Sequence, residues 1–257
     1  MNKTMQYLAG CAVALALAAA ALPVQAQGIT SEQANQILEE LRAIRKNLEA
    51  RPVAPLPSAP QAQAPQSDKV SYAFTPGAWV MGKDDAPLVL VEYTDYQCPF
   101  CQRFHNDTFA QIKANYIDTG KIKFISRDFP LSFHENAMRG AMAARCSAEQ
   151  GKYWDFRHTL IVNASQLQAD KINTYAQNAS LDVSKFKSCM DSNKYQDAIN
   201  KDMQEGQVAG VTGTPAFVLG RLQNGKLEGV RIVGAMPYAQ FDAKIQDYMK
   251  QTQTAKN

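Results

Sequence analysis

The chain has 257 residues, of which 46% are hydrophobic, a composition that is ordinary for a globular protein with one good-sized domain and additional segments. Its 27 basic and 24 acidic side chains give a formal net charge of +3, and no long run of Lys or Arg occurs. Because phosphate binding requires a dense basic face, this balance argues against nucleic acid as a partner.

Residues 1–26 have the pattern of a cleaved signal peptide. Lys3 precedes an apolar run over residues 8–22, and small residues follow up to Ala26. A membrane anchor is the alternative, although a span needs about 20 strongly apolar residues and this run is shorter and mostly alanine. Lipidation at Cys11 is a further alternative, but a lipoprotein processing box ends an apolar run and this one begins it. Without Cys11, four cysteines remain in a chain expected in the periplasm or another extracytoplasmic part of the envelope, where disulfides persist.

An amphipathic helix is predicted within residues 27–51, from Thr30 to Arg51. Thr30 and Gln33 form a capping box, and basic residues lie near the far end. Apolar side chains recur at alternating steps of three and four, which is a heptad seam. The seam consists of Ala34, Ile37, Leu41, Ile44 and Leu48. It predicts an oligomerisation stalk, a coiled coil between copies of the chain; packing of the stripe on the chain's own globular domain is the alternative.

The stalk is followed by a predicted linker over residues 52–67, which contain five prolines among Ala, Gln and Ser. Such a segment is an extended, semi-rigid spacer of roughly 3 Å per residue, or about 50 Å in all. A helix held at this distance packs back on the main domain less readily, so the linker favours the stalk.

Residues 68–257 are predicted to form an α/β domain. Strands over residues 88–93 and 122–129 flank a helix that opens after Cys98, which makes a strand, helix, strand unit. Residues from about 130 to 209 have helical patterns, and no strand is expected among them.

The end of the chain predicts a hairpin and a final helix. Strands over residues 216–219 and 229–233 flank an Asn-Gly pair at 224–225, which is a strong hairpin signal. Pro237 suits the first turn of the helix that follows. The apolar face of this helix is formed by Phe241, Ile245 and Met249.

The pair Cys98 and Cys101 carries the chemistry suggested by the sequence. It follows directly on a hydrophobic strand, with Pro99 at a helical position where a backbone N–H is not needed. A sulfur at a helix N-terminus faces free N–H groups and the positive end of the helix dipole, which favour its thiolate. Cys98 is therefore the predicted nucleophile. Cys101, one turn further and deeper, is the predicted resolving cysteine of a redox disulfide Cys98–Cys101.

Two other interpretations of the pair are possible. Cys98 and Cys101 could be half of a zinc site completed by Cys146 and Cys189, but structural zinc sites usually bring two close pairs or add histidines. An inert structural disulfide is the second, but a bond between neighbouring turns at a helix start constrains little of the chain. The redox interpretation is preferred, and no cofactor and no metal is expected.

The residues from Glu92 to Cys101, Glu-Tyr-Thr-Asp-Tyr-Gln-Cys-Pro-Phe-Cys, resemble the active-site segment of DsbA-like thiol-disulfide oxidoreductases. The resemblance covers most of the chain after the linker and implies a thioredoxin-like fold interrupted by a helical insertion. It identifies the loop at 213–217 as the family's cis-proline loop. Pro215 is then implied to be cis, and the backbone of Thr214 to be exposed for pairing with an extended substrate segment; a trans proline at the start of an edge strand is the alternative.

The resemblance and the spacing of residues around the cysteine pair also bear on four further side chains. Glu92 is implied to be a buried carboxylate that moves protons to and from Cys101, with a pKa raised by burial; a strand-edge Glu facing water is the alternative. His105 could reach the same helix face as Cys101, but an exposed polar residue is the preferred interpretation. Cys146 and Cys189 are expected to pair, as in some relatives. That bond would close a loop of about 44 residues and stabilise the fold by at most roughly 4 kcal/mol; two buried free thiols are the alternative.

Three functions follow. The first is a dithiol oxidase that passes its disulfide to exported proteins with cysteines and is reoxidised by a membrane redox partner; the helical insertion favours it. The second is an oligomeric disulfide isomerase or reductase, which the stalk favours. Phe100 stands where DsbA proteins often have a histidine, which is consistent with a milder oxidant. The third, more remote, is a non-catalytic metal-binding or chaperone protein.

Overall fold

The structure is a computed structural model that describes residues 29–49, 68–77 and 79–254. The predicted signal peptide over residues 1–26 and the predicted linker over residues 52–67 lie outside the described residues. The chain divides into two units, Met1–Ala64 and Pro65–Asn257, and each is described by itself. Among the helices of the described ranges, none has the length and apolar character needed to cross a membrane.

The described part of the first unit is the helix α1, Ser31–Glu49. The backbone N–H of Thr30 donates to Gln33 Oε1 over 3.1 Å, and the N–H of Gln33 donates to Thr30 Oγ1 over 3.2 Å. The predicted capping box is therefore confirmed. The side chains of Ile37, Leu41 and Ile44 are exposed. This helix thus presents an apolar stripe, and its self-association stays a prediction.

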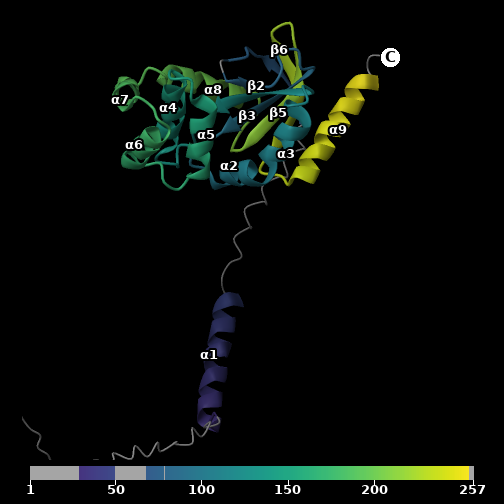
Figure 1. Cartoon of the computed structure of the whole chain (residues 1–257). Helices are drawn as coiled ribbons and strands as arrows, with labels where there is room; N and C mark the ends of the chain where they lie inside the picture. The colour runs from purple at the N-terminus through teal and green to yellow at the C-terminus, as the bar shows by residue number, and fades with distance from the viewer. Residues whose placement is uncertain (1–28, 50–67, 78, 255–257) are drawn as a thin grey trace, which may run out of the picture. The chain divides into compact units, whose positions relative to one another are not determined.

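The second unit is built on a mixed sheet with the strand order β1-β6-β5-β3-β4-β2 among the described residues (Figure 1). The strands are β1 Lys69–Ala73, β2 Val80–Met81, β3 Leu88–Thr94, β4 Ile122–Asp128, β5 Ala216–Gln223 and β6 Lys226–Val233. β3 and β4 run parallel, and the other neighbours are antiparallel. The hairpin predicted at Asn224-Gly225 is confirmed, and both of its turn residues have positive φ, which suits this dipeptide. The short strands β1 and β2 were not predicted.

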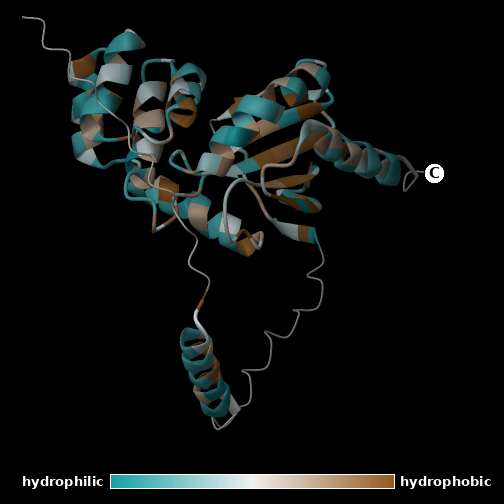
Figure 2. Ribbon diagram, turned by 90° about the horizontal axis from the view of Figure 1, so that it is seen from below, coloured by the Kyte–Doolittle hydropathy of each residue, from teal (hydrophilic) through white to brown (hydrophobic). Residues whose placement is uncertain are grey.

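The central strand β3 is buried along its whole length. Because side chains alternate across a strand, Leu88 and Leu90 pack into one layer of the core while Val89 and Val91 pack into the other. Figure 2 shows the hydrophobic character of the strands between more polar helices. Glu92 has the same parity as Leu90, so this lone carboxylate of β3 faces the layer that contains the helix after Cys98.

Helices on that face come from both ends of the domain. The segment after β3 is helical through α2 Pro99–Phe104, the π-helical turn His105–Phe109, α3 Ala110–Ile112 and a second π-helical turn, Lys113–Ile117. It packs with the last helix, α9 Tyr238–Thr254, in one apolar cluster. Phe241 and Ile245 of the predicted face are buried there, and Met249 is partly buried.

Between β4 and β5 the chain is helical, as predicted. The helices are α4 Ala137–Ala148, α5 Tyr153–Val162, α6 Ala169–Asn178, α7 Val183–Ser192 and α8 Gln196–Val208. They enclose a core of their own around Phe156 and Phe186. Cys146 of α4 and Cys189 of α7 are joined by a disulfide with a Cα–Cα distance of 5.8 Å.

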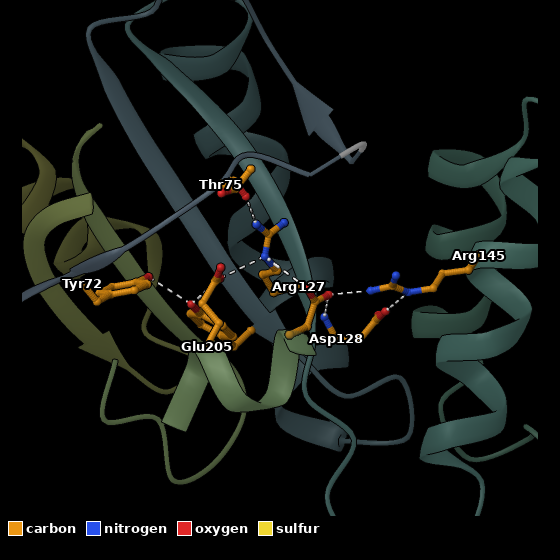
Figure 3. Close-up of polar contacts among 8 residues, drawn as sticks. Tyr72, Thr75, Arg127, Asp128, Arg145 and Glu205 are labelled. Carbon is orange, nitrogen blue, oxygen red and sulfur yellow. Dashed lines mark hydrogen bonds and ion pairs between the residues drawn. The ribbon is translucent and has the colours of Figure 1, made fainter. Parts of the chain in front are cut away.

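A buried ionic network attaches this helical block to the end of β4 (Figure 3). Arg145 of α4 contacts Asp128 and Asp202, each over 2.6 Å. Arg127 of β4 contacts Glu205 over 3.0 Å and Asp202 over 3.3 Å. Asp202 and Glu205 of α8 thus contact guanidinium groups of β4 and α4, and these contacts position α8 and the loop that follows it.

The network contains three carboxylates and two guanidinium groups, so one negative charge is left without a matching cation within it. Burial and the neighbouring Asp128 raise the pKa of Asp202 from 3.8 to about 7, although Arg127 and Arg145 oppose the shift. Asp202 is therefore the group of this network that takes up a proton near neutral pH.

We predict that Asp202 makes the fold less stable as pH rises. Because the folded state holds a proton on Asp202 up to about pH 7 and the unfolded state releases it near pH 4, the free energy of unfolding falls between these values. Between pH 5 and pH 8, Asp202→Asn should remove a pH dependence of at most about 3 kcal/mol. Urea denaturation of both proteins at pH 5 and pH 8 measures it, with the exposed Asp197→Asn on the same helix as the control. Equal pH dependence in wild type and Asp202→Asn would contradict the assignment.

Candidate active site

Cys98 lies at the junction of β3 and α2. It is the N-cap of α2 with an extended backbone, φ −74° and ψ 122°, and Pro99 occupies the first turn. The turn before it is held by Asp95, whose Oδ1 accepts the Gln97 N–H over 2.7 Å and whose carbonyl accepts the Cys98 N–H over 3.1 Å. The predicted strand-to-helix placement of the cysteine pair is confirmed.

Both cysteines of the pair are free thiols in the structure. Cys98 is 3% exposed and Cys101 is fully buried. The redox disulfide Cys98–Cys101 therefore stays a prediction. Because so little of Cys98 is exposed, a reacting disulfide must come close to the protein surface around this residue.

The environment of Cys98 favours its thiolate. Its pKa is lowered from 9.0 to about 6, chiefly by a hydrogen bond from Cys101, with burial opposing the shift. The Thr214 side chain and the backbone N–H groups of Cys101 and Phe100 lower it further. At pH 7, about nine-tenths of Cys98 is then ionised. The helix N-terminus lowers the pKa of Cys98, as expected from the sequence, but the hydrogen bond from the Cys101 thiol lowers it more.

Cys101 is shifted in the opposite direction. Burial, the neighbouring Cys98 sulfur and the charge of Glu92 raise its pKa well above the ordinary value. One thiol of the pair is therefore a thiolate near neutral pH and the other holds its proton, which is the division of roles expected of a nucleophile and a resolving cysteine.

The loop before β5 brings Thr214 and Pro215 to the same place. The Thr214–Pro215 peptide bond is cis. The Cys98 thiol donates a hydrogen bond to the carbonyl oxygen of Thr214 over 3.3 Å. A thiolate has no proton to donate, so ionisation of Cys98 releases this carbonyl.

Glu92 is fully buried beside two basic side chains. Its Oε2 lies 2.7 Å from Arg157 Nη2, and its Oε1 and Oε2 lie 3.1 and 3.2 Å from His105 Nε2. Burial raises the pKa of Glu92, but His105 and Arg157 outweigh it and the net pKa is lowered to about 2. The pKa rise expected from burial is therefore wrong, because burial also brought the carboxylate against a guanidinium.

The structure also corrects the interpretation of His105 and adds Arg157. His105 is buried rather than exposed, because the turn after Cys101 faces the core. Arg157 was missed. A signal for it was present: this cation lies among apolar residues at helical spacing in α5, between Tyr153 and Leu160, where a charge needs a buried partner.

The four cysteines do not gather into one site. Among the described residues, Cys146 and Cys189 lie close to Glu149 and not to Cys98 or Cys101, and their sulfurs are joined in a disulfide. The zinc site built from all four cysteines is thus excluded by geometry.

We predict that reduced Cys98 is alkylated by iodoacetamide with a midpoint near pH 6, because the thiolate is the reactive form. Cys101→Ala should raise the midpoint, since it removes the hydrogen bond that lowers the pKa most. Cys101→Ser keeps a hydroxyl donor and should stay closer to the wild type. A midpoint near the ordinary value of 9.0 in the wild type would contradict this electrostatic arrangement.

Comparisons with known proteins agree with this geometry. The Thioredoxin family model matches residues 75–247, more than half of the chain. Disulfide bond formation protein D of Bacillus subtilis is 29% identical over 152 residues, which are 55% of this chain and 67% of that protein. The structure of alpha-DsbA1 from Wolbachia pipientis has a TM-score of 0.60 and 25% identity, and the match covers 69% of this chain and 94% of that one.

A different kind of relative is the Na(+)/H(+) antiporter NhaA 1 of Mycolicibacterium gilvum. It is 30% identical over 161 residues, which are 61% of this chain but 26% of the antiporter. The chain thus spans about a quarter of the length of that relative, as one domain would. Together with the mixed sheet, the helical insertion and the cysteine pair at a helix N-terminus, the family match shows that the chain belongs to the thioredoxin family and is DsbA-like within it.

Proposed function

We propose that this protein is an exported thiol-disulfide oxidoreductase that exchanges disulfides with cysteine-containing proteins of the cell envelope. The observation that carries the proposal is the opposite pKa shift of two thiols one helical turn apart, with Cys98 lowered and Cys101 raised. The Thr214 carbonyl and cis Pro215 lie beside the reactive sulfur. The predicted signal peptide supports export, and the name of the Bacillus subtilis relative supports the reaction.

The exchange uses the two sulfurs in turn. A client thiolate attacks Cys98 of the oxidised pair, the Cys98–Cys101 bond breaks, and Cys101 leaves as a thiolate that takes up a proton. A second client thiolate then attacks the client sulfur of the mixed disulfide and releases Cys98 as a thiolate. The client loses two electrons to the pair, and a membrane redox partner carrying a disulfide reoxidises it.

The low pKa of Cys98 favours the oxidase direction. A stabilised thiolate stabilises the reduced protein, so the oxidised protein tends to accept electrons. A pKa of about 6 lies between those of thioredoxin, about 7, and DsbA, about 3.5. We therefore infer a milder oxidant than DsbA, in line with Phe100 between the cysteines.

A second candidate is an oligomeric disulfide isomerase or reductase. The exposed apolar stripe of α1 favours it, because a stripe of this kind is buried when helices of several copies associate. Several active sites would then act on one misfolded client. A non-catalytic metal-binding or chaperone role is a third reading, and it requires that client turnover be independent of Cys98.

We predict that the mature chain oxidises reduced ribonuclease and that a shortened chain beginning at Ser67 does so equally well. Activity on scrambled ribonuclease that is lost on shortening would establish the second candidate. Ile37→Glu with Leu41→Glu, compared with the control Arg42→Glu, tests the apolar stripe in the full-length protein. Sedimentation velocity on each protein reports the oligomeric state.

The same ribonuclease assay distinguishes the third candidate, a non-catalytic metal-binding or chaperone protein, from the first two. Cys98→Ser should abolish turnover, and Cys101→Ser should trap mixed disulfides with the client, since the resolving sulfur is absent. Full activity of Cys98→Ser together with loss of bound metal would exclude thiol-disulfide exchange.

A further inference from the structure

The helical insertion contributes a buried cation to the environment of the cysteine pair. Arg157 lies on α5, far along the chain from β3, yet its Nη2 is 2.7 Å from Glu92 Oε2 and its Nε donates to Ser126 Oγ over 2.9 Å. Glu92 and Ser126 are direct partners in the β3–β4 register. Arg157 therefore spans two neighbouring strands beneath α2.

We propose that Arg157 is a positioning residue that holds Glu92 as a permanent anion beside Cys101, so that Glu92 acts as a fixed charge and not as a proton carrier. This inference rests on the thiol-disulfide exchange proposed above. It gives the insertion a part in the chemistry, because the residue that sets the charge of a core carboxylate comes from outside the thioredoxin core.

The contacts explain why the charge is fixed. Arg157 and Glu92 are both buried, and a guanidinium does not lose its proton in proteins. Protonating Glu92 would leave this guanidinium buried without its counter-charge, which is strongly unfavourable. A proton carrier must gain and lose its proton near the working pH, and this pairing prevents that.

The other groups around Glu92 do not replace this pairing. His105 approaches the carboxylate from the turn after α2, and burial is the main reason that its pKa lies below 6.5, with Arg157 and His158 adding to the effect. It is therefore a neutral imidazole above that pH, and its Nε2 lies 3.1 Å from Glu92 Oε1 and 3.2 Å from Arg157 Nη1. Tyr96 and Tyr153 face Arg157, and burial raises the pKa of each, so both stay neutral.

A fixed anion has a measurable consequence at Cys101. Glu92 disfavours the Cys101 thiolate by the same amount at each pH at which it is ionised. The rate at which Cys101 resolves a mixed disulfide on Cys98 is then proportional to the fraction of Cys101 that is thiolate, and no second group affects its pH dependence. Between pH 6.5 and 8.5 this rate should rise about a hundredfold, tenfold per pH unit, without a break.

The test is the pH profile of this resolving step. The probe is the glutathione mixed disulfide of Cys98, and release of glutathione is followed by rapid quenching. In Arg157→Gln, Glu92 is buried without its guanidinium partner. It should titrate near the pH range of the measurement, since the pKa values of buried Glu residues reach about 8 to 9. The rate should then exceed that of the wild type at low pH, and the excess should shrink as Glu92 ionises. A profile equal to that of the wild type in both rate and slope would overturn the proposal.

Further variants distinguish the effect of the Arg157 charge from that of a general loss of stability. Arg157→Lys restores the cation and should restore the tenfold slope. Glu92→Gln with Arg157→Gln removes the titrating group, and this double variant should also show the tenfold slope. Arg145→Gln, which removes a buried arginine of the ionic network instead, should lower stability and leave the slope unchanged.

A second measurement serves if Arg157→Gln does not fold. The ¹³C carboxyl shift of Glu92 in the wild type should stay constant from pH 5 to pH 8.5, and a titration step in this range would overturn the proposal. Failure of the exchange itself looks different: the mixed disulfide would not form, or Cys101 would not resolve it. Resolution with an Arg157→Gln profile equal to that of the wild type in both rate and slope counts against the role of Arg157 alone.

Discussion

The hydrogen bond between the two sulfurs of the cysteine pair is the interaction on which the chemistry of this protein depends. It lowers the pKa of Cys98 more than any other contact, and the same contact helps to raise that of Cys101. Pro99, the extended N-cap and the turn held by Asp95 place the sulfur where backbone N–H groups add to this effect. The division between a reactive and a protected thiol therefore follows from the start of one short helix.

Buried arginines join the helical block to the sheet in two places. Arg145 and Arg127 hold the end of β4 and α8 together, and Arg157 connects α5 to β3 and β4. Buried ion pairs are weak evidence for stability but are costly to break on one side. They specify one arrangement of the block on the sheet. This arrangement places the loop carrying Thr214 after α8 and a permanent cation beside Glu92.

Several features of the protein were determined by the sequence alone. The short apolar runs and the Asn-Gly turn predicted β3, β4 and the final hairpin, because these signals are local. The capping box predicted the start of α1. The spacing of Cys98 and Cys101 behind a strand, with Pro99 between them, predicted which sulfur is the nucleophile, since a helix N-terminus favours a thiolate wherever it occurs.

Only the tertiary structure decided the charge state of the buried carboxylate of Glu92 and which side chains surround it. Glu92, His105 and Arg157 come from a strand, a helical turn and an inserted helix, and no local pattern records that they meet. Burial alone would raise the pKa of Glu92, whereas His105 and the Arg157 guanidinium, the latter at 2.7 Å, lower it. The sign of the pKa shift of Glu92 depends on these contacts between distant segments. The sequence therefore determined which residues were present, and the packing decided which of their charges interact.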